Sequence, residues 1–187
     1  MDFKEHQHYH CRNRAERLAF FQGSAAYYAA LAELIPRAQS RILIVGWSFD
    51  DRIRLIPDDQ DAQSVGDLLI AAAAANPTLR VELFIWKPPS LFSADQYISR
   101  AFRNRIRKVP NITLHHIPAE SAFASRHEKY IILDDALALA GGIDITSARW
   151  DTPDHRAQNP GRVNPEGEAY GPYHDTHAVF TGPVVRY

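Results

Sequence analysis

The chain has 187 residues, a length that suits one domain with a sizeable hydrophobic core. Hydrophobic residues make up 45% of it and charged residues 23%, as in ordinary globular proteins, and no apolar run approaches the roughly 20 residues that span a bilayer. The net charge of −1 gives no overall field that would attract nucleic acid or anionic lipid, and the single cysteine, Cys11, excludes an internal disulfide.

The first residues, 1–13, are expected to form an irregular lead-in. His6, His8 and His10 alternate there and could share one strand face, but a solvated terminal segment explains them better than a metal site. Beyond this lead-in, apolar content and bounding turn residues predict strands at 17–21, 41–47, 79–86, 112–117, 130–133, 136–140 and 177–181.

Helical spacing of apolar residues predicts helices at 24–35, 65–75 and 94–108, with Ser24 and Ser64 as the N-caps of the first two. The third helix has a basic face, for which a solvated surface is favoured over a patch for phosphate headgroups. Residues 152–172 are rich in Pro and Gly and are expected to form a long functional loop.

The strand at 41–47 is a nearly continuous apolar run, as expected of a strand covered on both faces. Strands of this kind that alternate with helices predict an α/β fold, with a mixed β-sheet flanked by helices on both faces. The strand ends in Trp47, which we expect near the rim of a pocket because sites in such folds collect beyond strand ends. Asp50 and Asp51 follow, and a salt-bridged turn is favoured there over a metal site.

The strongest chemical signal is the segment 125–151, in which His127 and Lys129 precede an apolar strand. Residues two apart in an extended strand point to the same face, so these two side chains can project together. A neutral imidazole beside an ammonium suits attack on a phosphate, with the ring as nucleophile and the lysine holding an anionic oxygen. A structural histidine and a solvated strand-end lysine are the alternatives.

His127, Lys129, Asp134 and the pair Gly141-Gly142 resemble the phospholipase D superfamily, whose signature is His-x-Lys-x4-Asp followed by a Gly-Gly or Gly-Ser turn. The continuation from 141 to 183 is similar to the phospholipase D branch, and Asp144 stands where the nuclease branch usually has Asn. The segment 23–55 is similar to the family's entry helix and Gly-Trp strand end.

The resemblance implies that Asp144 belongs to the catalytic site, where it would orient a histidine ring, and that Gly141 and Gly142 help to bind substrate, since their missing side chains allow close backbone approach. His155 and His174 match family positions and are expected to bind substrate, although no catalytic role can be derived for them. The resemblance implies that Asp134 belongs to the catalytic set, but strand parity does not place it on the catalytic face, so a structural role in the turn is physically easier. The resemblance implies neither a metal ion nor another cofactor.

The chain is therefore expected to be a phospholipase D-type phosphodiesterase, which cleaves or transfers the phosphatidyl group of phospholipids through a phosphohistidine. Because the reaction needs two histidines and His127 is the only one in a His-x-Lys context, residues 1–187 are expected to be one half-domain without the second half. A longer chain is favoured over a homodimer as the source of the second motif. The alternatives are a nuclease-type phosphodiesterase acting as a homodimer and an inactive phosphate-binding fragment. A nucleic-acid partner is not expected, and a cytoplasmic location with peripheral membrane contact fits the composition.

Overall fold

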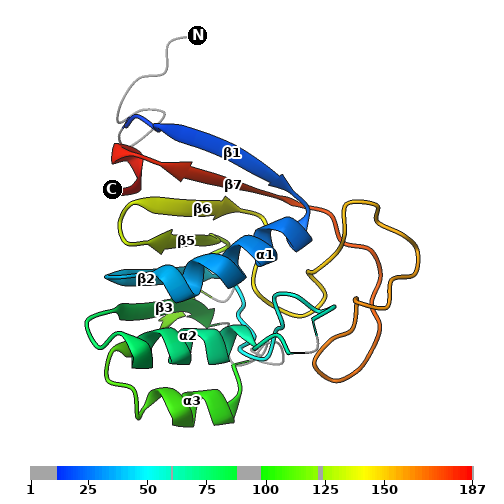
Figure 1. Ribbon diagram of the computed structural model, residues 1–187, viewed down its shortest axis with the longest axis horizontal. Coiled ribbons are helices and arrows are strands. Elements are labelled where there is room, and N and C mark those ends of the chain that lie inside the picture. Colours follow the sequence, from blue (N-terminus) through cyan, green and yellow to red (C-terminus); the bar gives the residue numbers. More distant parts are fainter. Residues whose placement is uncertain (1–11, 60, 88–97, 122–123, 187) are drawn as a thin grey trace.

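The computed structural model describes residues 12–59, 61–87, 98–121 and 124–186, and their strands form one seven-stranded sheet (Figure 1). The strand order across the sheet is β1-β7-β6-β5-β2-β3-β4. Every expected strand is present, with bounds within one residue of the prediction at each end. The strands are β1 (Arg17–Gln22), β2 (Arg41–Gly46), β3 (Arg80–Lys87), β4 (Ile112–Pro118), β5 (Tyr130–Leu133), β6 (Leu137–Gly141) and β7 (Thr176–Thr181).

The sheet is mixed, and its strand directions bring several strand ends to one edge. β2, β3 and β4 are parallel to one another, whereas the pairs β2–β5, β5–β6, β6–β7 and β7–β1 are antiparallel. The carboxyl ends of β2, β3, β4 and β6 therefore lie beside the amino ends of β5 and β7. We call this the His127 edge, because His127 lies three residues before β5 begins.

Three α-helices cover one face of the sheet: α1 (Ser24–Leu34), α2 (Val65–Ala75) and α3 (Arg100–Ile106) (Figure 1). Their buried side chains pack against strand residues of a single parity, such as Ile42, Ile44 and Ile131. The α/β class and the mixed sheet are thus confirmed, but the described helices all lie on one face. On the other face, the described residues include only the short 3-10 turn at Pro183–Arg186, beside β7.

The helix starts agree only in part with the prediction. Ser64 caps α2, because its Oγ accepts a hydrogen bond from the backbone N–H of Asp67. Ser24 instead lies inside α1, and its buried Oγ accepts from the backbone N–H of Asp151, which ties the helix to a distant loop. α3 begins at Arg100, where Ser99 provides the cap; residues 94–97 of the expected helix lie outside the described residues.

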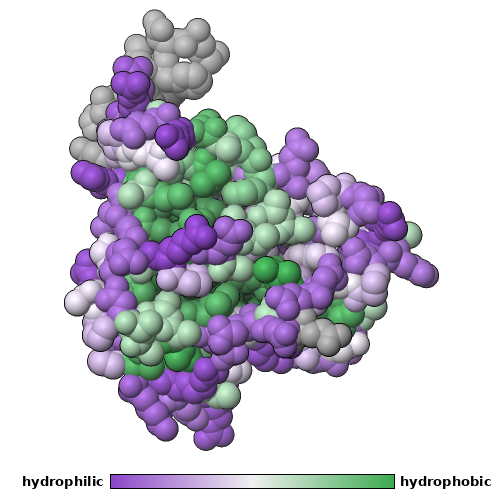
Figure 2. Space-filling model, in the orientation of Figure 1, coloured by the Kyte–Doolittle hydropathy of each residue, from purple (hydrophilic) through white to green (hydrophobic). Residues whose placement is uncertain are grey.

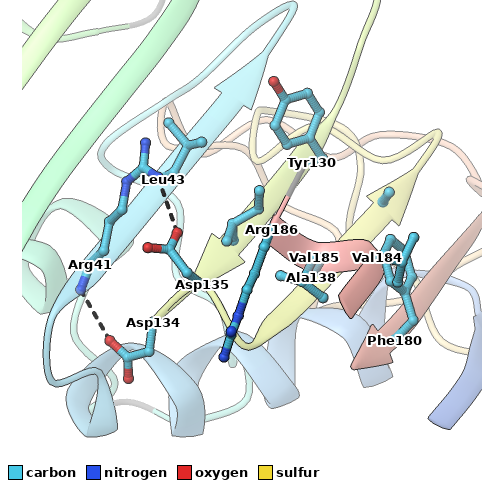
Figure 3. A pocket seen from close by; sticks show the side chains of 12 residues that line it. Arg41, Leu43, Tyr130, Asp134, Asp135, Ala138, Phe180, Val184, Val185 and Arg186 are labelled. Atoms are coloured by element: carbon cyan, nitrogen blue, oxygen red, sulfur yellow. Dashed lines mark hydrogen bonds and ion pairs between the residues drawn. The ribbon is translucent and has the colours of Figure 1, made fainter. Parts of the chain in front are cut away.

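The face opposite the helices is apolar and hollowed. Leu43, Ala138 and Phe180 lie in a hollow of about 810 Å³, with Arg41 and Arg186 at its rim (Figure 3). Leu18 and Phe20 of β1 pair with Phe180 and Ala178 and so share this face, where Phe20 is 67% exposed. On the helical face, Figure 2 shows a further hydrophobic area over β6 and β7, beside α1.

A long loop leaves β6 and returns to β7 at the His127 edge (Figure 1). Residues 142–175 contain no helix or regular strand, which confirms the expected loop and extends it in both directions. Among the described parts of the chain, no helix is long and apolar enough to cross a membrane.

Candidate active site

His127, Lys129 and Trp47 come together at the His127 edge. The His127 ring is exposed, and its centre lies 5.8 Å from that of Trp47, edge-on at 61°. Nζ of Lys129 lies 6.0 Å from the centre of the same indole. Trp47 is fixed from two sides, since it stacks on Trp86 at 5.7 Å and its Nε1 donates to Oγ of Ser125 at 2.9 Å. Trp47 was expected only near the rim of a pocket, and the structure places it beside His127 and Lys129.

The Lys129 side chain is only 5% exposed, and its ammonium is held by a buried carboxylate. Nζ lies 3.0 Å from Oδ2 of Asp144 and donates to the backbone oxygen of His127 at 3.2 Å. Oδ1 of Asp144 accepts from the backbone N–H groups of Trp47 and Ser48 at 3.0 and 3.2 Å. A buried charge is tolerated when it is paired and hydrogen-bonded in this way. Within the described structure Asp144 therefore orients the lysine, whereas the resemblance had suggested a histidine ring as its partner.

This arrangement combines an exposed imidazole with a fixed cation. An ammonium has three N–H donors, of which one goes to the oxygen of His127, while Oδ2 of Asp144 lies at ion-pair distance without a hydrogen bond in the described structure, so donors remain for an anionic oxygen. A donor fixed before the reaction stabilises charge that develops on phosphate without further reorganisation. The geometry can therefore bind and polarise a phosphate group next to an imidazole.

The two glycines at the end of β6, Gly141 and Gly142, lie in close contact with the start of β7. A Cβ on Gly141 would lie 2.3 Å from the backbone oxygen of Thr176, and a Cβ on Gly142 would lie 2.1 Å from the carboxylate of Asp175. A side chain at Gly141 would push the start of β7 away from β6, whereas one at Gly142 would displace the side chain of Asp175. These contacts account for the glycines without any contact to substrate.

Asp134 lies at the opposite end of the sheet, after β5. Its carboxylate accepts hydrogen bonds from the backbone N–H groups of Gln39, Ser40 and Arg41, and its own backbone is left-handed, with φ of 55°. Burial would raise the pKa of Asp134, but these hydrogen bonds outweigh it and lower the pKa below its usual value. Asp134 is therefore brought to the turn and not to His127, which fits the structural role that strand parity favoured and not the catalytic role that the resemblance implied.

His155 and His174 do meet each other, within the long loop. Nε2 of His155 lies 2.9 Å from Nδ1 of His174, and Nδ1 of His155 lies 3.0 Å from Oδ2 of the buried Asp151. Arg162, also buried, completes the cluster through Asp151. The sequence assigned no role to Asp151 or Arg162, because periodicity says nothing about contacts within an irregular loop.

The sequence also gave no sign of a histidine inside the core. His177 is 1% exposed, stacks on the ring of Tyr27 at 4.0 Å, and has no hydrogen-bond partner for either ring nitrogen in the described parts of the chain. Burial lowers its pKa to about 4, to which the charge of Lys129 contributes while Asp175 opposes it. The His177 ring is therefore neutral at physiological pH, and it does not repel the ammonium of Lys129.

Asp50 and Asp51 hold a hydrogen-bonded turn after β2. Asp50 pairs with Arg52 at 2.9 Å, and Asp51 accepts from the backbone N–H and the hydroxyl of Ser99. Both carboxylates thus accept hydrogen bonds from the protein, in agreement with the salt-bridged turn that the sequence predicts. Over the residues that the structure describes, no three His, Cys, Asp or Glu side chains are grouped as metal ligands. His6, His8 and His10 lie outside the described residues.

Known proteins with similar sequences and folds share this architecture. A family model described as Phospholipase D matches residues 34–186. Phospholipase D2 of Bos taurus is 29% identical over 143 residues, which cover 76% of this chain and 15% of the relative. The chain thus spans about a sixth of the length of that curated relative.

Solved structures agree at the level of the fold. Phosphatidylserine synthase of Haemophilus influenzae matches with a TM-score of 0.61 and 19% identity, over 91% of this chain and 34% of that one. Nuc of Salmonella typhimurium, a phospholipase D family member, matches with a TM-score of 0.53 and 18% identity, over 89% of this chain and 84% of that one. Together with the family model, which covers most of the sequence including the His127 edge, these likenesses lead to one conclusion: the chain belongs to the phospholipase D family.

Proposed function

We propose that this chain supplies half of the active site of a phosphodiesterase that cleaves or transfers the phosphatidyl group of phospholipids. The observation that carries the proposal is the buried Lys129 ammonium, held 3.0 Å from Asp144 beside the exposed ring of His127. The chain's membership of the phospholipase D family supports the phosphodiester as substrate, and two similar proteins, phospholipase D2 and phosphatidylserine synthase, have names that favour a lipid.

In the proposed reaction, a ring nitrogen of His127 attacks phosphorus and the bond from phosphorus to the headgroup oxygen breaks. A second histidine, in protonated form, gives its proton to the leaving oxygen. The same histidine then takes a proton from water or an alcohol, whose oxygen attacks phosphorus and releases His127. Lys129 stabilises the negative charge on the phosphoryl oxygens in both steps.

The second histidine is proposed to come from a second His-x-Lys motif, either in a longer chain or in a second copy of this one. The exposure of His127 fits either arrangement, because a second half would cover it. In a pair of identical copies the same patch would meet itself about a two-fold axis.

The test is to trap the intermediate in the assembled enzyme. A substrate labelled on phosphorus should leave an acid-labile, base-stable adduct on His127, and His127→Ala should abolish both adduct and turnover. Lys129→Ala should lower turnover by about 10²–10³ or more, since one donor to a developing charge is worth that much. An adduct on another residue, or more than a few per cent of activity in His127→Ala, would refute the assignment.

In the proposed reaction, lysines stabilise the negative charge on the phosphoryl oxygens, so no divalent metal is required. EDTA should therefore leave turnover unchanged, measured on the same lipid substrate with and without added zinc or calcium. Loss of activity in EDTA and its return with either metal would contradict this mechanism. A salt-sensitive gel shift with DNA would favour the nuclease alternative.

A further inference from the structure

Two large apolar side chains of the edge strand β1 are exposed to solvent. Leu18 is 58% exposed and Phe20 67%, and residues two apart in a strand point to the same face. Leu18 pairs with Phe180 and Phe20 with Ala178, and Phe180 lines the hollow on the face opposite the helices, so both exposed side chains lie on that face. Exposed apolar groups that gather on one surface mark a site of contact with another protein or with a membrane.

The exposed pair adjoins the hollow on the same face. Phe180 is the pairing neighbour of Leu18 and also lines the hollow of about 810 Å³, with Leu43 and Ala138 further along it (Figure 3). We call Leu18, Phe20 and Phe180 the β1 patch. The patch and the hollow together form an apolar surface that none of the described α-helices covers.

Positive charge borders the β1 patch along the chain. Arg12, Arg14 and Arg17 come just before Leu18 and are all exposed. Glu16 is the only acidic residue between positions 12 and 22, so three arginines and one glutamate give this stretch a net charge of +2. Among the described residues, no carboxylate forms an ion pair with any of the three guanidinium groups.

A fourth arginine joins this group at the same corner of the molecule. The backbone N–H of Val184 donates to the backbone oxygen of Arg14 at 3.3 Å, and Val184 lines the hollow together with Arg186. Arg186 is exposed and likewise has no ion pair with a described residue. The two carboxylates that line the hollow, Asp134 and Asp135, are already engaged by backbone amides and by another arginine. The corner therefore presents unpaired positive charge next to an apolar surface.

This combination matches an anionic bilayer better than a second copy of the chain. Arginines at a bilayer surface pair with lipid phosphates, while apolar side chains beside them enter the acyl region. A second copy that paired through the same patch would bring its own four arginines into one interface, where like charges repel.

We propose that the β1 patch binds the surface of a bilayer that contains anionic lipid, with Leu18 and Phe20 inserted among the acyl chains and the four arginines at the lipid phosphates. Such binding would hold a phosphodiesterase where its phospholipid substrate lies. That benefit rests on the proposed function, whereas the binding itself needs neither His127 nor turnover.

Vesicle sedimentation of the full 187-residue chain tests the need for anionic lipid. Vesicles of phosphatidylcholine in which one lipid in three is phosphatidylglycerol should bind the chain. Phosphatidylcholine alone should bind it about tenfold more weakly or less, since each arginine near an anionic surface contributes about a factor of five. Salt at about 1 M, where the Debye length is about 3 Å, should remove most of this difference. Equal binding to the two kinds of vesicle would overturn the proposal.

Substitutions at exposed positions test which surface makes the contact. Phe20→Ser should weaken binding to the anionic vesicles about tenfold, because it removes most of one inserted side chain. Arg14→Gln should weaken it about fivefold and lower its salt dependence. Val163→Ser in the long loop and Arg103→Gln on α3 are the matched controls and should bind as the wild type does. Urea unfolding checks that all four variants keep their stability. An equal loss in Arg103→Gln would assign the lipid contact to α3 and overturn the proposal.

Phe20→Trp gives a direct readout of insertion. The fluorescence that this tryptophan adds to that of the wild type should shift to the blue on anionic vesicles and be quenched by lipids brominated in their acyl chains. Unchanged emission would overturn the proposal. So would sedimentation, in the absence of lipid, of a dimer that Phe20→Ser converts to a monomer, because the patch would then belong to a second copy. Since none of these measurements uses turnover, the absence of an adduct on His127 would refute the proposed function and leave membrane binding standing.

Discussion

At the scale of the residue, the two oxygens of Asp144 have separate tasks. Oδ1 accepts two backbone amides at the end of β2, and Oδ2 faces the ammonium of Lys129. The first task holds the strand end and the second holds the charge that the proposed reaction needs. Substitutions of Asp144 can separate the two tasks. Asparagine keeps a neutral acceptor for the backbone amides but loses the charge, and alanine loses both.

Asp144→Asn should lower both stability and turnover. It leaves a buried lysine without its counter-charge, which costs about 3–5 kcal/mol. Asp144→Ala should be less stable still, because two amides also lose their acceptor, at about 1–3 kcal/mol for each. Urea unfolding measures the free energies of unfolding and so the order of stability of these variants. The double variant Lys129→Met with Asp144→Asn is the decisive control. It should recover most of the stability and none of the activity; losses that simply add would show that the pair is not coupled.

The sequence predicts part of this site for a clear physical reason. His127 and Lys129 are two residues apart, so strand periodicity alone suggests that they act together. The pairing of Lys129 with Asp144 depends on two loops that meet only after β2, β5 and β6 have assembled, and no local pattern encodes it. The same holds for the buried Asp151 and Arg162, which lie in a loop without periodicity.

At the scale of the element, the turn after β5 is fixed by Asp134. One carboxylate joins this turn to the start of β2 through three backbone amides and the hydroxyl of Ser40. The spacing of the signature, five residues from Lys129 to Asp134, is thus the length of β5 plus one residue. The signature thus has a residue at each end of β5. Lys129 lies at the end where the proposed chemistry takes place, and Asp134 lies at the other end, where it fixes the turn against β2.

Asp134→Ala should destabilise the fold by about 1–3 kcal/mol, since the amides lose a charged acceptor and alanine fits the left-handed backbone poorly. The pKa of Asp134 is lower in the folded chain than in the unfolded one, so its contribution is fully present above the unfolded value of 3.8 and is lost as pH falls through the folded value. Urea unfolding of the wild type and of Asp134→Asn, followed by circular dichroism at a series of pH values, measures this loss. The difference in stability between the two proteins should shrink as pH falls and vanish below both pKa values; a constant difference down to pH 2 would contradict this role for the carboxylate.

The elements themselves follow closely from the sequence, and the exceptions have physical causes. Apolar runs bounded by turn residues locate all seven strands. The third helix begins later than its apolar spacing suggests, because Ser99 provides a cap that a periodic pattern does not register. The apolar run of β2 predicts helices on both faces of the sheet, whereas the described α-helices lie on one. Leu43 of this run is buried on the other face although no described α-helix lies over it.

At the scale of the whole molecule, the proposed site is half of a pair. We expect the isolated monomer to bind vanadate weakly and to turn over almost nothing, because it lacks the second histidine. Sedimentation and a phosphodiester assay across protein concentration test this together. Activity that rises with the dimer fraction would identify a second copy as the partner, whereas activity that requires a separate half would identify a longer chain. A strictly monomeric chain with robust, concentration-independent specific activity would refute the half-site proposal.

The pairing of β1 with β7 has a consequence for how the chain is made. Residue 22 ends β1 and residue 176 begins β7, so 153 residues are synthesised between the two strands. At 5–20 residues per second, about 8–30 s pass before β7, the neighbour of β1 among the described strands, has been synthesised. During that time Leu18 and Phe20 are part of an unpaired strand edge, the kind of surface that chaperones bind and that aggregation uses. The N-terminal strand is thus the first part of the sheet to be made and among the last to find its place.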